Sequence, residues 1–254
     1  MSSTKDWSNK VIDNFEQAAK LYNDNAIIQR EFAKRLAKVC SRQSIPKGLW
    51  TDLGSGTGLL ADALEGLHPN QTVLRVDGSE GMLSQQEIKN DFQLWDLNLG
   101  LPTWDEPPSL IASSFALHWL SSPAERLEEW IKALPPSGWL ALAVPIKGSF
   151  PEWHLAAECA EVRCTAMPLP SGDLLIEVLN QAKSCCYQKV QTISQEHDNP
   201  FSLLKAIKAV GAQATTEKKL TRGEMRNLIK SWPRTQGTNS ARLTWHIQLA
   251  LIQK

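Results

Sequence analysis

Apolar residues recur along the chain at two different spacings, and the change from one spacing to the other predicts the order of the elements. Between residues 10 and 39 they recur every three or four positions, which predicts two amphipathic helices. Short apolar runs at 49–53 and 72–76 predict two buried strands, and helical spacing predicts a helix at 59–67. A strand, a helix and a second strand in this order form a βαβ unit with parallel strands.

The same alternation continues to about residue 150. Further strands are predicted at 92–95, 110–113 and 139–144, and further helices at 81–89 and 124–134. Five strands separated by helices indicate an α/β fold, in which a parallel sheet carries helices on both faces.

The pattern changes in the last hundred or so residues. Helical spacing at 152–167 and 174–182, with a proline-rich break between them, predicts a helical lid inserted after the fifth strand. Alternating apolar residues at 186–194 and 243–252 predict two closing strands. Basic amphipathic helices are predicted between these strands, at 201–210 and 221–232.

The densest chemical pattern lies between the first two strands. The first strand ends in Asp52 and is followed by the loop Gly54-Ser55-Gly56-Thr57-Gly58, and the second strand ends in Asp77. A glycine loop between a strand and a helix is typical of a nucleotide pocket. Dinucleotide sites use G-x-G-x-x-G, but Leu59 stands where the third glycine would be. Asp52 would repel a pyrophosphate, whereas it suits the cationic amino group of S-adenosylmethionine, and Asp77 can accept both ribose hydroxyls.

We therefore predict one domain over residues 1–254 with a cofactor-binding core at 46–150. N-terminal helices at 1–45 precede this core. The lid occupies 151–183, and the closing strands with the basic helices occupy 184–254.

Composition limits the class and the location of the protein. The 254 residues are 42% hydrophobic and 21% charged, which fits one large globular domain and not a disordered chain. The longest apolar runs are too short to span a bilayer and the first residues lack a signal-peptide core, so we expect a cytoplasmic protein without membrane contact. The five cysteines lack zinc-site spacing, and no metal is expected.

The formal net charge of zero hides an asymmetry. Residues 51–138 hold 13 acidic and 4 basic side chains, whereas residues 201–254 hold 2 acidic and 10 basic ones. Solvated helix faces can differ in sign without consequence, but a basic surface can also dock an acidic partner. RNA is a competing polyanion, yet no RNA-binding motif accompanies the charge and the tryptophans do not alternate with basic residues, so nucleic acid is not expected.

The glycine loop, Asp77, the run Trp95-Asp96-Leu97 and the run from Ser113 to Trp119 together resemble the class I S-adenosylmethionine-dependent methyltransferases. The resemblance covers almost the whole chain. It implies a Rossmann-like fold whose seven-stranded, mostly parallel sheet has an antiparallel last strand. It also implies a set of cofactor contacts, namely Asp52, Gly54, Ser55, Gly56, Gly58, Asp77, Gly78, Asp96, Leu97 and Ser114.

Segments outside the core narrow the resemblance. Residues 15–22, 148–152 and 201–212 are similar to the malonyl-acyl-carrier-protein O-methyltransferases of biotin synthesis, the BioC family. So are Leu220-Thr221-Arg222 and the tail, with Trp232-Pro233, Gln236-Gly237 and Leu243-Thr244-Trp245-His246 in the family's order. The chain departs from the family pattern at two positions, where Ser55 replaces a common cysteine and Ser114 a more usual asparagine.

This resemblance implies methyl transfer from S-adenosylmethionine to the free carboxylate of a malonyl thioester on acyl carrier protein, which would dock on the basic C-terminal surface. Arginine can hold a carboxylate with two hydrogen bonds, so Arg222 is the first candidate for binding the malonyl group, with Arg163 and Arg242 as rivals. Tyr22 from the N-terminal helices would close over the cofactor, and His118 would orient the acceptor. The expected substrate contacts are therefore Tyr22, His118, Trp119, Ser149, Arg163, Arg222 and Arg242.

Three alternatives remain open from the sequence. The chain could methylate another small carboxylic acid or metabolite, because the cofactor residues do not distinguish acceptors. It could be a non-catalytic nucleoside-binding module, although such a module has no chemical need for both acids and all three glycines. A nicotinamide oxidoreductase is disfavoured by the missing third glycine.

Overall fold

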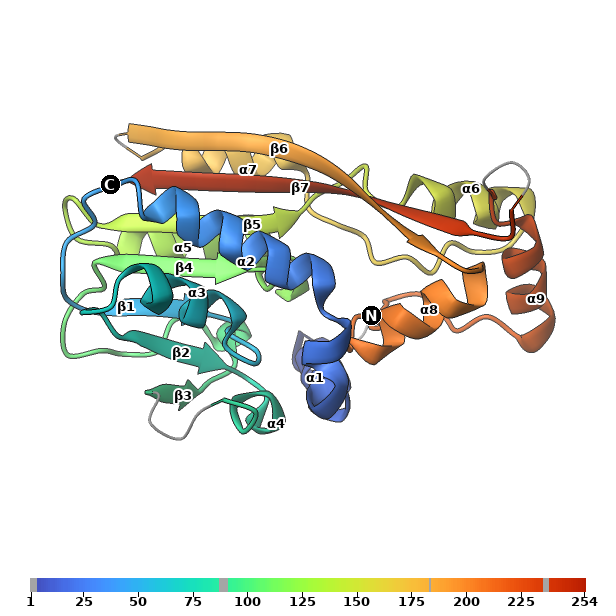
Figure 1. Ribbon diagram of the computed structural model, residues 1–254, viewed down its shortest axis with the longest axis horizontal. Coiled ribbons are helices and arrows are strands. Elements are labelled where there is room, and N and C mark those ends of the chain that lie inside the picture. Colours follow the sequence, from blue (N-terminus) through green and yellow to red (C-terminus); the bar gives the residue numbers. More distant parts are fainter. Residues whose placement is uncertain (1–3, 87–90, 183, 235–237) are drawn as a thin grey trace.

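A computed structural model describes residues 4–86, 91–182, 184–234 and 238–254. Its centre is a seven-stranded sheet in the order β3-β2-β1-β4-β5-β7-β6 (Figure 1). The strands are β1 (Trp50–Leu53), β2 (Val73–Asp77), β3 (Phe92–Leu94), β4 (Leu110–Ser114), β5 (Trp139–Pro145), β6 (Ser184–His197) and β7 (Ala241–Gln253).

The first five strands are parallel to one another, and β7 pairs antiparallel with both β5 and β6. This is the mostly parallel sheet of the class I methyltransferase fold, as predicted. The chain builds outward from β1 to β3, then returns to place β4 on the other side of β1. Loops that leave β1 and β4 diverge at this switch point and open a crevice at the carboxyl ends of the strands.

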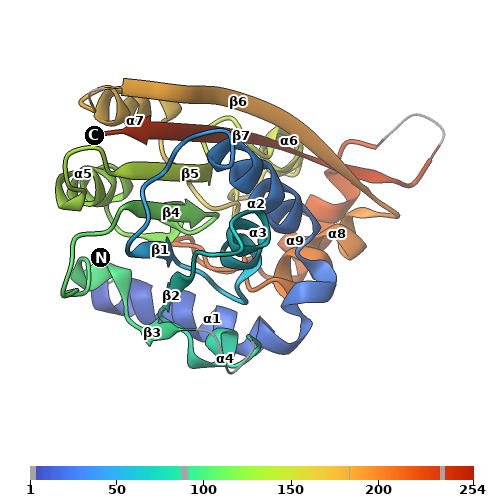
Figure 2. The ribbon, with the colours of Figure 1, turned by 60° about the vertical axis from the view of Figure 1, so that its left-hand side comes forward.

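Helices cover both faces of the sheet, as Figure 2 shows. The helices α2 (Ile27–Cys40) and α3 (Leu59–Leu67) pack together on one face, and α5 (Pro123–Ala133) and α7 (Gly172–Leu179) pack together on the other. Side chains alternate accordingly along β5: Trp139, Ala141 and Ala143 join the first core cluster, whereas Leu140, Leu142 and Val144 join the second. Every residue of β5 is buried, which explains its continuous apolar sequence.

The strands β6 and β7 extend past the ends of the other strands, and three helices gather around the extension (Figure 1). Only the second half of β7, from Ile247, pairs with β5, while β6 follows β7 back to Ala241. The helices at the extension are α6 (Pro151–Cys159), α8 (Pro200–Ala209) and α9 (Arg222–Ser231).

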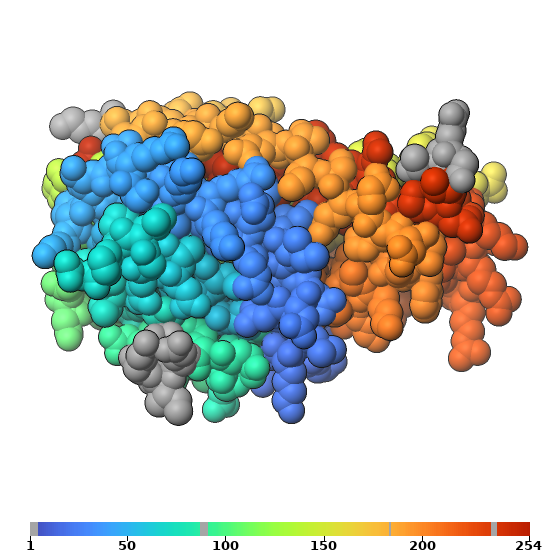
Figure 3. All heavy atoms as spheres, viewed as in Figure 1, coloured from blue at the N-terminus to red at the C-terminus, as the bar shows by residue number. Residues whose placement is uncertain are grey.

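The first helix, α1 (Thr4–Asn25), contacts α4 (Glu80–Leu83) of the core and also α8. Figure 3 shows this blue segment between the teal core and the orange C-terminal residues. Short 3₁₀ helices follow β3 and β4, at η1 (Leu97–Leu99) and η2 (Leu117–Trp119).

The predicted helix at 152–167 is wrong over its second half, because α6 ends at Cys159. Glu161 adopts a left-handed backbone with φ of 54°. The Glu161 and Val162 N–H groups then donate to the Glu158 and Ala157 carbonyls, both at 3.0 Å, which is the Schellman pattern that closes a helix. Helical spacing of apolar residues does not reveal such a termination, since glutamate is not a usual residue at the left-handed position.

The predicted helix at 81–89 is also too long. In the structure α4 has four residues, with Ser84 as its C-cap, and 87–89 lie outside the described residues. The predicted helix at 174–182 ends at Leu179. The lid segment divides in two, because α7 lies against α5 on the sheet while α6 lies against α9 and β7. The role of residues 151–183 as a lid stays a prediction.

Candidate functional site

The crevice at the carboxyl ends of β1 to β4 holds two adjoining cavities. The first, called here the loop cavity, is lined by the glycine loop, by the ends of β1, β2 and β4, by residues 96–98 and by one side of α1. The second, called here the outer cavity, lies toward α6, α8 and the segment 212–220. Five residues line both cavities and form the wall between them: Phe15, Tyr22, Gln29, Phe115 and Trp119.

The glycine loop leaves β1 in a conformation that requires glycine. Gly54 has φ of 72°, and a Cβ built on it would lie 2.2 Å from Ala116 Cβ. The N–H groups of Gly54 and Ser55 both donate to the Val76 carbonyl, at 2.8 and 3.0 Å, which ties the loop to β2. Gly58, with φ of 88°, is the N-cap of α3. A backbone held in this way leaves open space at Gly56, where a built Cβ would meet nothing within 4 Å.

The two acidic strand ends face the loop cavity with different partners. Asp77 accepts from the N–H groups of Gly56 at 2.7 Å and Ser79 at 2.9 Å. Burial raises the pKa of Asp77, although these N–H groups oppose the shift. Asp52 is 1% exposed and accepts from Ala61 N at 3.1 Å through Oδ2, while Oδ1 has no hydrogen-bond partner among the described residues. Burial raises the pKa of Asp52 to about 7, because a desolvated carboxylate disfavours its charge.

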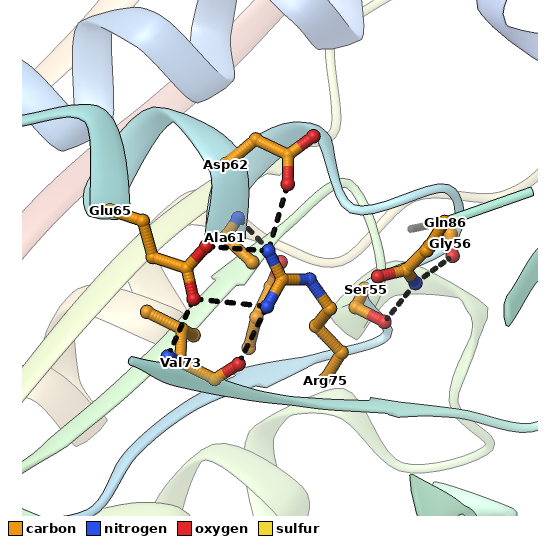
Figure 4. A network of polar contacts seen from close by, with 9 residues as sticks. Ser55, Gly56, Ala61, Asp62, Glu65, Val73, Arg75 and Gln86 are labelled. Carbon is orange, nitrogen blue, oxygen red and sulfur yellow. Dashed lines mark hydrogen bonds and ion pairs between the residues drawn. The ribbon is translucent and has the colours of Figure 1, made fainter. Parts of the chain in front are cut away.

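A buried arginine joins the strand and the helix that flank the glycine loop (Figure 4). Arg75 on β2 reaches α3, where its guanidinium donates to Asp62 at 2.8 Å and to both carboxylate oxygens of Glu65 at 2.8 and 3.0 Å. In the same view Gln86 donates to the Gly56 carbonyl at 2.8 Å. Arg75 thus joins β2 to α3, and Gln86 separately holds the glycine loop.

The N-terminal helix α1 covers the loop cavity with one apolar stripe, formed by Val11, Ile12 and Phe15. Its polar residues fasten it to the core. Ser8 Oγ donates to Asp96 Oδ2 at 2.6 Å, and the Glu16 carboxylate accepts from Ser79 Oγ at 2.6 Å and Gly81 N at 2.7 Å.

The two cavities differ in charge. The charged residues that line the loop cavity are Asp52, Asp77 and Asp96, with no Lys or Arg among its described lining residues. The charged residues that line the outer cavity are Lys208 and Lys219, with no Asp or Glu among its described lining residues. Most other residues of the outer cavity are apolar, including Phe150, Trp153, Leu204, Met225 and Trp245. The structure thus places an acidic pocket against a basic, largely apolar one.

Most residues predicted to touch cofactor do line the loop cavity. These are Asp52, Gly54, Ser55, Gly56, Asp77, Gly78, Asp96, Leu97 and Ser114. Gly58 does not line it but shapes the loop. Tyr22 and Trp119 stand in the shared wall, and His118 lines the outer cavity, 5% exposed and with an unpartnered Nδ1. Burial lowers the pKa of His118 to about 3, so its imidazole is neutral at pH 7.

Four predicted substrate contacts lie away from the two cavities. Ser149 is 3% exposed. Its hydroxyl donates to the Ile146 and His246 carbonyls and accepts from His246 N. Arg242 is exposed and pairs with Glu196 at 2.7 Å on the edge of the extended strands. Arg222 begins α9 on the surface, and Arg163 is exposed after α6. The structure brings none of these three arginines to the acceptor side.

From the sequence alone, Lys208 and Lys219 belong only to a general basic surface, and nothing marks Gln29 or Ser8 as lining a cavity. Lys208 lies in the last turn of α8, and Lys219 lies between α8 and α9. No motif distinguishes these lysines from their neighbours Lys205 and Lys218. Only the fold, in which α8 and the segment after it lie against α1, shows which lysines reach a cavity.

Comparisons with known proteins agree with this geometry. A family model described as a methyltransferase domain matches residues 51–142. A malonyl-[acyl-carrier protein] O-methyltransferase of Dechloromonas aromatica is 30% identical over 80% of this chain and 76% of that protein. One of Coxiella burnetii is 26% identical over 96% of both chains. The structure of magnesium protoporphyrin IX methyltransferase from Synechocystis, solved with bound SAH, matches 95% of this chain and 99% of that one with a TM-score of 0.58 and 13% identity.

The acidic loop cavity, the seven-stranded sheet and the methyltransferase domain define a class I methyltransferase that uses S-adenosylmethionine. Within that class, the chain belongs to the BioC family of malonyl-[acyl-carrier protein] O-methyltransferases. Unpartnered atoms in the loop cavity fit this cofactor, because Asp52 Oδ1 and Ser114 Oγ are buried without a hydrogen bond and can serve an ammonium group or a hydroxyl.

Among the residues that the structure describes, no helix is long and apolar enough to cross a membrane. Nor do these residues contain a cluster of three or more His, Cys, Asp or Glu side chains able to hold a metal ion.

Proposed function

We propose that this chain transfers a methyl group from S-adenosylmethionine to the free carboxylate of a malonyl thioester on acyl carrier protein, at the start of pimeloyl synthesis for biotin. The observation that carries the proposal is the pair of adjoining cavities with opposite charge. The acidic cavity suits a donor with a sulfonium and an ammonium group, and the basic cavity suits an anionic acceptor. The names of the relatives in Dechloromonas and Coxiella support the choice of acceptor.

The main contribution of the protein to this reaction is to position the donor and the acceptor. S-adenosylmethionine, when bound, supplies an electrophilic methyl group. A malonyl carboxylate is already ionised at pH 7, so no general base is needed to create the nucleophile. This agrees with a buried, neutral His118, whose lowered pKa of about 3 makes it a poor base. Orientation across the shared wall can supply roughly 7–11 kcal/mol in favourable cases.

The wall between the cavities is suited to this transfer. Phe115 and Trp119 are buried, and Phe15 packs edge-on against Trp119 with ring centroids 5.5 Å apart. The methyl group moves from a positively charged sulfur to a negatively charged carboxylate oxygen. Both charges therefore disappear as the carbon–oxygen bond forms and the carbon–sulfur bond breaks. An apolar wall that excludes water favours a step in which charge is lost. Tyr22 stands in this wall with a pKa raised by burial and by the nearby Asp77 and Asp52, so its hydroxyl stays protonated and can donate to the acceptor.

Acyl carrier protein is expected to dock on the basic surface of the C-terminal helices. The basic residues of this surface lie on α8, on the following segment and on α9, and they are Lys205, Lys208, Lys218, Lys219, Arg226 and Lys230. All six are exposed, and α8 and α9 lie at the same end of the molecule in Figure 1. A positive surface around the cavity mouth speeds encounter with an acidic carrier.

Mass spectrometry of malonyl-acyl carrier protein incubated with S-adenosylmethionine tests the proposal. We expect the acyl group to gain one methyl, and acetyl-acyl carrier protein, which lacks the carboxylate, to gain none. Transfer to free small carboxylic acids, but not to the malonyl thioester, would instead favour the second candidate, a methyltransferase for another acid. The observation that supports this second candidate is the largely apolar lining of the outer cavity, which suits the uncharged part of a small acid.

A further inference from the structure

The outer cavity is lined by two lysine side chains that pair with no acidic group among the described residues. The side chains of Lys208 and Lys219 line it, both are exposed, and neither makes an ion pair or a hydrogen bond with the described residues. They come from different segments, since Lys208 is in α8 and Lys219 lies just before α9. The acid nearest to them in sequence, Glu217, does not line the cavity. Two unpaired ammonium groups in a cavity without a lining carboxylate form a place for an anion.

The reacting carboxylate has a different position in the same cavity. Methyl transfer must cross the shared wall, because only there do the cofactor side and the acceptor side meet. That wall consists of Phe15, Tyr22, Gln29, Phe115 and Trp119 and contains no cation. The lysines stand at solvent-exposed positions of the lining, whereas Phe115 and Trp119 are buried. An acceptor that reaches the wall with one end therefore needs a second anionic group to use the lysines.

We infer that Lys208 and Lys219 form a subsite for a phosphate group on the arm that carries the acyl chain. This inference rests on the proposed function, because a carrier-protein thioester hangs on a flexible arm attached through a phosphodiester. Apolar side chains such as Leu204 and Met225 line the same cavity, which suits the uncharged part of such an arm. The terminal carboxylate has the same anionic chemistry, so the experiment must separate the two groups.

The experiment compares the malonyl thioesters of pantetheine and of 4′-phosphopantetheine, which differ only in the phosphate. Wild-type enzyme should show a KM about tenfold lower for the phosphorylated thioester. The Lys208→Ala/Lys219→Ala double variant should lose this preference and keep its kcat on both thioesters. The matched control is Lys205→Ala/Lys230→Ala, which removes two exposed lysines of α8 and α9 that do not line the cavity. The control should keep the preference.

Three results would overturn the subsite. Wild-type enzyme could show no preference for the phosphorylated thioester, or the lysine-pair variant could lose the same factor in KM on both thioesters. The control variant could also lose the preference as fully as the lysine-pair variant does. Equal losses on both thioesters would mean that the lysines hold the carboxylate. Calorimetry with 4′-phosphopantetheine and with pantetheine, neither carrying an acyl group, tests the subsite without turnover. Phosphate-dependent binding that needs the lysine pair would support the subsite even if no malonyl thioester were methylated, and lysine-independent binding would refute it.

Discussion

At the scale of single residues, the site depends on carboxylates whose burial is unusual for ionisable groups. Asp52 is almost wholly buried, lines the loop cavity, and has one carboxylate oxygen without a hydrogen-bond partner among the described residues. Its pKa, raised to about 7, means that the ligand-free protein holds a proton there over part of the physiological range. A cationic ligand group beside the free oxygen favours the ionised form, so binding and proton release are coupled.

This coupling predicts the pH dependence of cofactor binding. We predict that the ionised carboxylate binds the ammonium group, so that affinity for S-adenosylhomocysteine rises with pH by about tenfold per unit below pH 7 and levels off above it. Calorimetry in buffers of different ionisation enthalpy should show about one proton released per ligand at pH 6. Asp52→Asn should bind more weakly and lose the slope. A slope that persists in this variant would assign the titration to another group.

The residues that line the loop cavity could be predicted because the conformation of the glycine loop is set by its backbone. Gly54 and Gly56 adopt left-handed backbone conformations in the turn between a strand and a helix. The position of such a glycine run after a predicted strand therefore indicates its place in the pocket. Long cationic side chains give no such local signal. Arg222 and Arg163 fitted a family segment or a predicted lid, yet they lie on the surface, while Lys208 and Lys219 reach the cavity through the packing of elements far apart in the sequence.

At the scale of elements, the cofactor side is held by the contact between β2 and α3. Arg75 is 1% exposed and joins the two through Asp62 and Glu65, and Glu65 also accepts from Val73 N at 2.9 Å. The acids differ in exposure, with 62% for the Asp62 side chain and 27% for Glu65. Stabilisation therefore comes mainly from the Arg75–Glu65 pair, since the solvent screens Asp62.

We predict that Arg75→Met lowers the free energy of unfolding by about 3–5 kcal/mol, because it removes one partner of a buried ion pair. Urea unfolding at fixed pH and salt measures this. The control is Asp62→Asn at the exposed end of the same network, for which a loss of about 0–1 kcal/mol is expected. Equal losses in the two variants would show that burial does not distinguish the pairs.

Sequence periodicity predicted the elements of the core well and their ends less well. The predicted helix at 59–67 matches α3 in both bounds, because Gly58 marks its start and the apolar stripe its length. The helix predicted to 167 stops at Cys159 through a left-handed glutamate that propensity does not favour. The extension of β6 to His197 was underestimated for a different reason. Its second half is stabilised by pairing with β7 beyond the edge of β5, which is a long-range contact.

At the scale of the whole molecule, the charge asymmetry of the sequence becomes an arrangement in space. The acidic stretch 51–138 contains the core around the loop cavity, and the basic stretch 201–254 contains α8, α9 and the extension (Figure 1). The outer cavity lies on the basic side, so under the proposed function a negatively charged carrier would be attracted toward the cavity that its acyl group enters.

This arrangement predicts a substrate-dependent effect of salt. With malonyl-acyl carrier protein, kcat/KM should fall about tenfold as ionic strength rises from about 25 to about 250 mM, because exposed charges farther apart than about 10 Å are screened over that range. With malonyl-pantetheine, which carries no protein, kcat/KM should change less than about twofold. The charge reversal Lys205→Glu/Lys230→Glu should flatten the salt dependence for the carrier substrate and leave malonyl-pantetheine turnover unchanged. A salt dependence of equal size for both substrates would place the effect in the catalytic site and contradict steering by the basic surface.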